Sequence, residues 1–267
     1  MNMMAKRGKG TTPFETYEAR TPSAQNAIDA IDGWVGAFPP EFGLTAGDRY
    51  LFNDGRLEFA AEQFGALDGR AVLELGPLEA SHTCGLVAKG AVVDAVEANK
   101  KAFLRCLVTK EITKLQNASF HLGDAVKWLE DSPKRYDFIF ACGVLYHMPD
   151  PVRLLEAIAA RTDAVYLWTH YVDVDALPPG DQRRNDWNAT AETKDLAGQS
   201  IRLFRRSYLK ANETAEFCGG AFDDHRWMDR NDILKVLALL GLSTITVAHE
   251  DHSSPFGSSF SVFARRP

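Results

Sequence analysis

The chain has 267 residues, of which 45% are hydrophobic and 25% charged, with a formal net charge of −6. These values are typical of a globular chain with a large core, and they exclude collagen, coiled coil and intrinsic disorder. The acidic balance also argues against an extended nucleic-acid partner, because phosphate binding relies on an excess of Lys and Arg.

Neither the cysteines nor the N-terminus indicates secretion or a membrane. The four cysteines are widely spaced without a Cys-x-x-Cys pair, which favours reduced thiols and a cytoplasmic protein. Residues 1–10 are basic but lack the apolar segment of a signal peptide, and no apolar run is long enough to span a membrane. We therefore expect no membrane partner, and the sequence is silent on the oligomeric state.

An N-terminal arm and a helical cap are expected over residues 1–68, with roughly the first 20 residues as a loose polar arm. Ser23 is a good N-cap for a helix that starts near Ala24 and ends before Phe38-Pro39-Pro40. A second amphipathic helix begins at Asp54 and stops at Gly65. The apolar faces consist of Ile28, Ile31 and Trp34 in the first helix and Leu57, Ala61 and Phe64 in the second.

From residue 70 onwards, short apolar strands alternate with helices. The pattern predicts strands at 71–76, 91–97, 119–122, 136–142 and 164–168, and helices at 79–89, 100–115, 125–129 and 150–160. Strands without polar alternation, separated by helices, are typical of a parallel sheet covered on both faces. The helix over 100–115 is expected to pack through Phe103, Leu104, Leu107 and Ile112.

The C-terminal part is expected to complete the same domain, which we place at residues 69–267. A polar stretch after the fifth strand predicts an insertion at about 173–225. A helix at 231–240 and strand-like segments at 244–249 and 258–264 follow it. The expected fold is a doubly wound, mostly parallel, Rossmann-like α/β sheet with the helical cap before it and an antiparallel C-terminal strand.

The end of the first strand is where such a sheet binds its ligand. The segment Glu74-Leu75-Gly76-Pro77-Leu78-Glu79-Ala80 lacks the G-x-G-x-x-G spacing of a dinucleotide site, and no nucleoside-triphosphate loop motif occurs. Glu97 closes the second strand about 20 residues later, the interval of a ribose-binding carboxylate. An adenosyl ligand without a phosphate chain fits both facts, and a solvated carboxylate is the competing interpretation of Glu97.

Four motifs in this order resemble those of the class I S-adenosylmethionine-dependent methyltransferases, over about residues 70–171 and more weakly over 227–267. They are Val72-Leu73-Glu74-Leu75-Gly76, the segment 94–99, Leu122-Gly123-Asp124, and Tyr136-Asp137-Phe138-Ile139-Phe140 with Gly143-Val144-Leu145-Tyr146-His147 and Asp150-Pro151. The Gly-Pro-Leu-Glu form of the first motif and the Gly-Val-Leu-Tyr-His form of the fourth occur in a subset of the family. The resemblance implies S-adenosylmethionine as the cofactor.

The resemblance also implies the cofactor contacts. Glu74 and Gly76 would hold the methionine end, Glu97 the ribose, and Asp124 the adenine amino group, with Ala125 beside the ring. The same resemblance places five further residues at the cofactor: Pro77, Ala98, Gly123, Cys142 and Gly143. Leu78 and Ala80 depart from the family pattern, because most members have glycines at these two positions.

Candidate catalytic residues follow the fourth and fifth strands. A sulfonium methyl is already activated, so the enzyme mainly aligns the acceptor and excludes water. Tyr146 and His147 should face the methyl group, and His170 lies at the same rim. A histidine with a pKa near about 6.5 suits a base for a hydroxyl acceptor. A structural histidine is the competing interpretation for both rings.

Three weaker features have less specific interpretations. A metal site would need the set His225, His249, His252, Asp224 and Asp251, but its spacing is poor, so we favour solvated loop histidines and predict no metal. An RNA-binding, carboxylate-binding or merely exposed patch would consist of Arg202, Arg205, Arg206, Phe204 and Tyr208. A core or a lid over the cofactor would consist of Trp34, Phe38, Tyr50 and Phe52.

The function expected from these residues is S-adenosylmethionine-dependent methylation of a small molecule at oxygen or nitrogen. One alternative is a tRNA-modifying methyl- or carboxymethyltransferase, because the segment 143–147 also resembles that of the wobble-uridine carboxymethyltransferases. A second alternative is an enzyme that cleaves or cyclises the cofactor and releases methylthioadenosine. A non-catalytic adenosyl-binding module is the least favoured. No motif identifies the acceptor.

Overall fold

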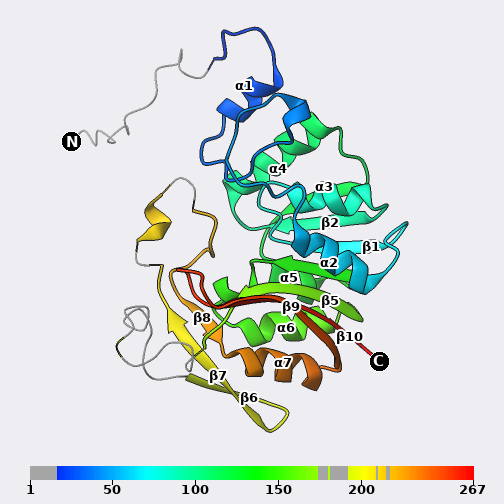
Figure 1. The fold of residues 1–267 in the computed structure, drawn as a ribbon, viewed down its shortest axis with the longest axis vertical. Coiled ribbons are helices and arrows are strands. Elements are labelled where there is room, and N and C mark those ends of the chain that lie inside the picture. Colours follow the sequence, from blue (N-terminus) through cyan, green and yellow to red (C-terminus); the bar gives the residue numbers. More distant parts are fainter. Residues whose placement is uncertain (1–16, 174–179, 181–191, 209, 215–216) are drawn as a thin grey trace, which may run out of the picture.

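The computed structural model of the protein describes residues 17–173, 180, 192–208, 210–214 and 217–267 (Figure 1). Most of the expected polar arm and part of the expected insertion lie outside these residues. None of the helices within the described ranges combines the length and the hydropathy that a membrane span requires.

A sheet of seven strands lies at the centre of the described part of the chain, in the order β3-β2-β1-β4-β5-β10-β9 (Figure 1). Strands β1 to β5 pair in parallel, and β10 runs antiparallel between β5 and β9. The strands are β1 Ala71–Leu75, β2 Val92–Glu97, β3 Ala118–Leu122, β4 Phe138–Cys142, β5 Ala164–His170, β9 Thr244–Asp251 and β10 Ser259–Arg265. The predicted doubly wound, mostly parallel sheet with an antiparallel C-terminal strand is confirmed.

Helices cover both faces of this sheet and bury two separate apolar cores. Helices α2 Gly55–Phe64 and α3 Ser81–Ala88 pack on one face, and α5 Ala125–Asp131, α6 Pro151–Ala159 and α7 Arg230–Leu239 pack on the other. Figure 1 shows α6 and α7 side by side along the sheet. Because the strand order reverses between β1 and β4, the carboxyl ends of these two strands border the crevice where such folds bind ligands.

Helix α4 Lys100–Thr113 packs through a different face from the one expected. Leu104 and Leu107 are 48% and 40% exposed, whereas Arg105 is 1% exposed. The other buried residues of the helix are Ala102, Cys106 and Thr109. The expectation was wrong because a buried ion pair turns Arg105 inward, and hydrophobic periodicity cannot show such a pair.

The N-terminal cap begins with a shorter helix than expected, α1 Ala24–Asp29. Its N-cap is Ser23, as predicted. Ile31 and Trp34 lie beyond the helix, because the chain turns at Gly33, where φ is 77°. The indole of Trp34 still reaches back and donates to the carbonyl oxygen of Ile28 at 3.0 Å.

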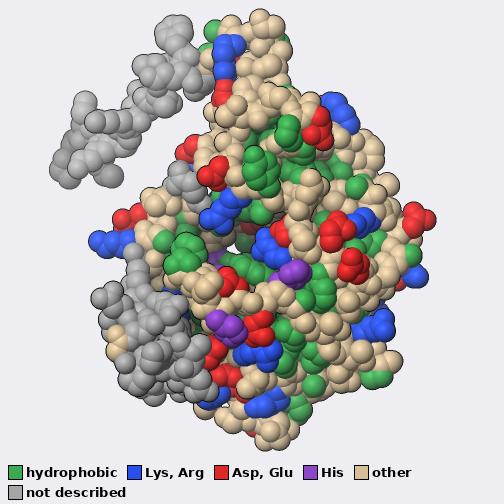
Figure 2. All heavy atoms as spheres, in the orientation of Figure 1, with side chains coloured by type: hydrophobic (Ala, Val, Ile, Leu, Met, Phe, Trp, Pro, Cys, Tyr) green, Lys and Arg blue, Asp and Glu red, His purple; other side chains and the backbone are tan. Residues whose placement is uncertain are grey.

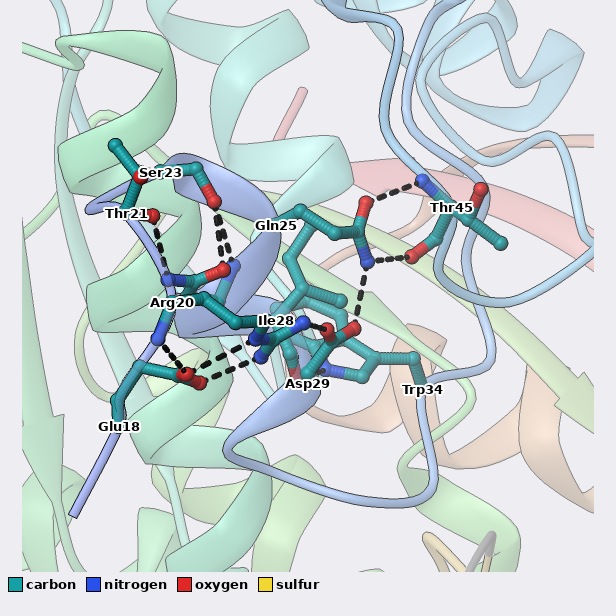
Figure 3. Close-up of polar contacts among 10 residues, drawn as sticks. Glu18, Arg20, Thr21, Ser23, Gln25, Ile28, Asp29, Trp34 and Thr45 are labelled. Atoms are coloured by element: carbon teal, nitrogen blue, oxygen red, sulfur yellow. Dashed lines mark hydrogen bonds and ion pairs between the residues drawn. The ribbon is translucent and has the colours of Figure 1, made fainter.

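Side chains of α1 tie together the segments on either side of it (Figure 3). Arg20 donates to Asp29 at 2.6 Å and also pairs with Glu18, so the chain is ordered before residue 20. Gln25 exchanges two hydrogen bonds with the backbone of Thr45, at 2.8 and 2.9 Å. The cap is therefore a folded loop around one short helix, followed by the 3-10 turn Pro40–Phe42.

A second, antiparallel sheet of three strands lies within the expected insertion and just after it, in the described part of that region. Its strands are β6 Glu192–Leu196, β7 Gln199–Arg206 and β8 His225–Met228. Strand β8 packs against the 3-10 turn Leu145–His147 that follows β4. Backbone hydrogen bonds join Arg226 to Met148 at 2.9 Å and Val172 to Met228 at 2.8 Å. This small sheet therefore covers the carboxyl end of the central one.

Candidate functional site

The structure brings the strand-end motifs together at one edge of the sheet. The amide of Gly76 donates to the carbonyl of Val96 at 2.9 Å, and the amide of Gly123 donates to the carbonyl of Glu97 at 2.9 Å. Gly76 also faces the segment after β4, since a Cβ there would lie 3.0 Å from Val144 Cγ2. Figure 2 shows a hollow near the centre of one face, with hydrophobic side chains inside it and charged ones at its rim.

The loop after β1 has a left-handed backbone, which favours glycine, at two positions occupied by other residues. The φ angles of Gly76, Leu78 and Ala80 are 65°, 57° and 67°. A left-handed backbone costs a non-glycine residue roughly 1–2 kcal/mol, so Leu78 and Ala80 are strained. In this conformation the amide of Leu78 donates to Glu97 Oε2 at 3.0 Å. The loop therefore has a left-handed backbone at both positions where the sequence departs from the family's glycines.

Glu74 is a buried acid at the end of β1 with one carboxyl oxygen that has no hydrogen-bond partner among the described residues. Thr83 Oγ1 donates to Glu74 Oε2 at 2.5 Å, and Oε1 has no hydrogen-bond partner among the described residues. Burial raises the pKa of Glu74 to about 8. An unpartnered buried oxygen is costly to a fold unless a ligand satisfies it. A ligand ammonium group would satisfy it.

Glu97 is not the solvated carboxylate of the competing interpretation. It is 8% exposed. Its Oε2 accepts from the amide of Leu78, and its Oε1 accepts from the amide of Asn99 at 2.8 Å. Burial raises its pKa, although these amides oppose the shift. Each carboxylate oxygen has a second acceptor direction, so two ribose hydroxyls could still bind.

Asp124 caps a helix beside an open cavity. Its Oδ1 accepts from the amides of Val126 and Lys127 at 2.8 and 3.0 Å, at the start of α5. A cavity of about 700 Å³ lies next to it, between the ends of β2 and β3 and α5. Its lining includes Val96, Leu122, Gly123, Asp124, Lys127 and Trp128. This cavity is large enough for a planar base.

The three predicted catalytic side chains lie together at the rim. The ring of Tyr146 is 4.0 Å from that of His147 and 4.8 Å from that of His170, between centroids. Two residues complete the group: Trp227 of β8, and Tyr208 in the segment between β7 and β8. Trp227 stacks on His170 at 5.3 Å, and Tyr208 Oη lies 2.8 Å from His147 Nδ1. No sequence pattern indicated that Trp227 belongs here, and Tyr208 was singled out only as part of the arginine-rich stretch before it.

Neither histidine has the pKa near 6.5 that was expected. Burial, with smaller contributions from His225 and His170, lowers the pKa of His147 to about 3. Burial also lowers the pKa of His170, and the carbonyls of Gly257 and Ser258 oppose this shift. Both imidazoles are therefore neutral at pH 7. Burial raises the pKa of Cys142, another predicted cofactor contact, to about 12.

The histidines proposed as solvated loop residues are not all solvated. His225 is 2% exposed on β8 and stacks on Tyr208 at 4.2 Å. His249 packs edge-on against Phe59, and His252 pairs with Asp173 at 3.5 Å. Within the described ranges, no group of three or more His, Cys, Asp or Glu side chains is arranged to hold a metal ion.

The arginine-rich stretch of β7 is not an open basic patch. Arg202 pairs with Asp229 and Asp232, at 3.0 and 3.5 Å. Arg205 pairs with Asp224 at 3.1 Å. The remaining members are Arg206, which lies 4.0 Å over the Trp227 ring, and Phe204, which is buried. Neighbouring carboxylates therefore offset much of the positive charge.

A buried ion pair joins α4 to the loop after β1, and both of its side chains also bond the backbone of the cap. Glu79 Oε1 accepts from Arg105 Nη1 at 2.6 Å, and both side chains are about 97–98% buried, at 3% and 2% exposure. Glu79 also accepts from the amides of Val35 and Gly36, at 2.8 and 2.7 Å. Of the four aromatics expected to form a core or a lid, Phe38 is buried and packs 5.7 Å from Trp34 and 5.6 Å from Phe52 between ring centroids, whereas Tyr50 is 76% exposed.

A polar cluster at the start of α2 was not predicted. Asp54 pairs with Arg56 and lies 2.9 Å from His82 Nε2, and the Arg56 guanidinium lies 4.7 Å over the ring of Trp168 near the end of β5. Although burial raises it, hydrogen bonds from His82 and Arg56 hold the pKa of Asp54 well below its ordinary value. The sequence placed the start of a helix at Asp54, and Asp54 is the N-cap of α2.

Comparisons with known proteins agree with this architecture. No family model matches the chain. The ribosomal RNA small subunit methyltransferase A of Bartonella bacilliformis is 31% identical over 94 residues, which are 35% of this chain and 33% of that protein. The match therefore spans about a third of that curated relative.

Solved structures cover much more of the chain. The N-terminal domain of EvdMO1, crystallised in the presence of SAH and D-fucose, has a TM-score of 0.68 and 23% identity over 91% of this chain and 95% of that one. Magnesium protoporphyrin IX methyltransferase from Synechocystis PCC 6803 with bound SAM has a TM-score of 0.51 and 16% identity, over 85% and 88%. The 1,6-didemethyltoxoflavin-N1-methyltransferase of Burkholderia thailandensis has a TM-score of 0.52 and 14% identity, over 82% and 79%. The chain therefore has the fold of the S-adenosylmethionine-dependent methyltransferases.

Proposed function

We propose that this protein is a class I S-adenosylmethionine-dependent methyltransferase that methylates a small molecule at oxygen or nitrogen. The observation that carries the proposal is the loop after β1, whose left-handed backbone directs the amide of Leu78 onto the buried carboxylate of Glu97. This arrangement offers acceptors for a ribose and no cradle for a phosphate chain. It lies at the strand-order reversal of a fold shared with methyltransferases.

The residues of the site fit this cofactor. The unpartnered Oε1 of Glu74 suits the ammonium group of the methionine end when the carboxyl is ionised, and a bound cation would favour that form. Glu97 suits the ribose, and the cavity beside Asp124 suits the adenine. The proposed cofactor contacts are Glu74, Gly76, Pro77, Glu97, Ala98, Gly123, Asp124, Ala125, Cys142 and Gly143. When bound, the cofactor supplies a methyl group on a positively charged sulfur.

The proposed acceptor side consists of Tyr146, His147 and His170. Aromatic faces favour a sulfonium cation, and a packed aromatic rim excludes water from the transfer. Both histidines are neutral, so in each ring one nitrogen carries a proton and donates a hydrogen bond, and the other has a lone pair that can accept one. A small molecule fits this rim better than RNA, because carboxylates pair with two of the three arginines on β7.

Calorimetry with the purified protein tests the cofactor. S-adenosylmethionine and S-adenosylhomocysteine should bind, and NAD should not. Glu97→Ala should weaken S-adenosylhomocysteine binding by about 10- to 150-fold, the range for hydrogen bonds to a charged group. The matched control is Glu111→Ala, which removes an exposed carboxylate from α4 and should leave the affinity unchanged. Failure of both adenosyl compounds to bind would refute the proposal.

Product analysis distinguishes the reaction types. Methyl transfer yields S-adenosylhomocysteine, and only when an acceptor is present. Release of methylthioadenosine from the cofactor alone would instead identify an enzyme that cleaves or cyclises the cofactor. Salt-dependent binding of tRNA or ribosomal RNA, with label transferred from methyl-labelled cofactor, would identify an RNA-modifying enzyme.

A further inference from the structure

The hydroxyl group of Tyr208 lies between two polar groups of the site. Its Oη accepts a hydrogen bond from the amide of Gly220 at 2.8 Å and lies 2.8 Å from His147 Nδ1. The Tyr208 ring is held by stacking on His225 at 4.2 Å and by an edge contact with Phe217 at 4.8 Å. The hydroxyl therefore sits in a fixed position, although it lies 61 residues along the chain from His147.

The close approach of Gly220 depends on its lack of a side chain. A Cβ at Gly220 would lie 2.7 Å from the carbonyl oxygen of His147 and 3.1 Å from Tyr208 Oη. Such a Cβ would push the loop away from both residues. The absence of a side chain at Gly220 thus lets its segment pack closely on the 3-10 turn after β4, where the Gly220 amide reaches the Tyr208 oxygen.

The hydrogen-bond pattern determines where the protons are. The Gly220 amide donates to Tyr208 Oη, and among the described residues His147 Nδ1 is the acceptor in reach of the phenolic proton, so we assign the phenol as the donor to Nδ1. Burial raises the pKa of Tyr208 to about 12, so the phenol keeps this proton at pH 7. A neutral imidazole that accepts at Nδ1 carries its own proton on Nε2.

His170 has the opposite arrangement. Its Nδ1 lies 3.0 Å from the carbonyl oxygen of Gly257 and 3.3 Å from that of Ser258. Carbonyl oxygens only accept, so Nδ1 must be the protonated nitrogen and Nε2 must carry the lone pair. Two histidines that both pack against Tyr146 are therefore held in opposite tautomers.

We propose that Tyr208 is a positioning residue that holds His147 in the tautomer with its proton on Nε2. His147 then serves the acceptor as a hydrogen-bond donor, and His170 Nε2 is the nitrogen left to accept a proton. This division of roles rests on the proposed methyltransferase function, whereas the tautomers themselves do not. From the sequence, His147 and His170 were both candidates for the same role, that of a base; the proposal gives them different roles.

Long-range ¹H–¹⁵N spectra of the full chain, labelled on the histidine rings, test the proposal without an acceptor. His147→Asn and His170→Asn identify the two spin systems. We expect an acceptor-type Nδ1 and a protonated Nε2 for His147, and the reverse for His170. A proton on Nδ1 of His147 in the unmodified protein would overturn the proposal.

Tyr208→Phe should convert His147 to a mixture of tautomers and leave His170 unchanged. Tyr166→Phe is the matched control, because it removes a buried hydroxyl that bonds Ser261 at 2.8 Å in the core of the sheet. The control should leave the His147 pattern intact. An unchanged His147 pattern in Tyr208→Phe would also overturn the proposal.

Kinetics then test the consequence for catalysis. With an acceptor in hand, Tyr208→Phe should lower kcat by about 2- to 13-fold, the range for one neutral hydrogen bond, with an unchanged KM for the cofactor. An unchanged kcat would overturn the positioning role. Absence of S-adenosylhomocysteine binding to the unmodified protein would refute the proposed function instead, and the tautomer spectra would still decide the arrangement of protons.

Discussion

Removal of the Glu79 carboxylate should destabilise the protein by about 3–5 kcal/mol, the cost of leaving one partner of a buried ion pair without the other. Glu79→Ala leaves the guanidinium of Arg105, 2% exposed, with only the carbonyl of Gly33 as a partner among the described residues. It also removes the acceptor for the amides of Val35 and Gly36. The free energies of the individual hydrogen bonds to Glu79 would sum to more than this, but the bonds share one carboxylate and their contributions are not additive.

Chemical denaturation followed by circular dichroism measures this loss, and a thermal scan should show Tm lower by about 6–20 °C at about 2–4 °C per kcal/mol. Glu58→Ala is the matched control, because Glu58 is 57% exposed and pairs with Lys89 at 2.7 Å. An exposed pair of this kind contributes about 0–1 kcal/mol.

The double variant Glu79→Leu/Arg105→Met separates the unpaired charge from the lost hydrogen bonds. It removes both charges, so it should lose less stability than Glu79→Ala alone. The deficit that remains should come from the amides of Val35 and Gly36, which lose their shared acceptor, and should stay below the loss of Glu79→Ala. If Glu79→Ala loses no more than Glu58→Ala, the cap is not held by this ion pair and our account of α4 fails.

The remaining predictions concern buried acids, histidines and backbone strain. Glu74 has a pKa of about 8 against an ordinary 4.5, so it binds a proton more tightly when folded and stability should fall as pH rises from 4.5 through 8. Glu74→Gln should remove this decline in urea denaturation at pH 5 to about 8.5. The pKa of His147 is shifted in the opposite direction, to about 3 from an ordinary 6.5, so the unfolded chain binds the proton more tightly and stability falls as pH drops below 6.5. His147→Gln should lessen that loss. Ala80→Gly should be neutral or stabilise by up to about 1 kcal/mol in the same assay, whereas Ala61→Gly inside α2 should cost about 1 kcal/mol. If Ala80→Gly lost as much stability as Ala61→Gly, the backbone at Ala80 would not be strained.

The order of strands and helices was determined by local sequence. Ser23, Asp54 and Asp150 each cap the helix that was expected to follow them. The apolar runs of β1 and β4 predicted buried parallel strands, and the structure confirms both. The pattern is informative because a strand covered on both faces must be apolar at successive positions. The motifs therefore lie at the strand ends where the pattern placed them.

Tertiary structure decided the state of each side chain in the site. Glu97 could be read as solvated, yet it holds two backbone amides in a nearly buried position. His147 was assigned an ordinary pKa, which burial lowers. Its partner Tyr208 follows β7, 61 residues along the chain from His147, and no local pattern connects it to β4. Protonation and tautomer depend on burial and on long-range hydrogen bonds, and these exist only once the chain has folded.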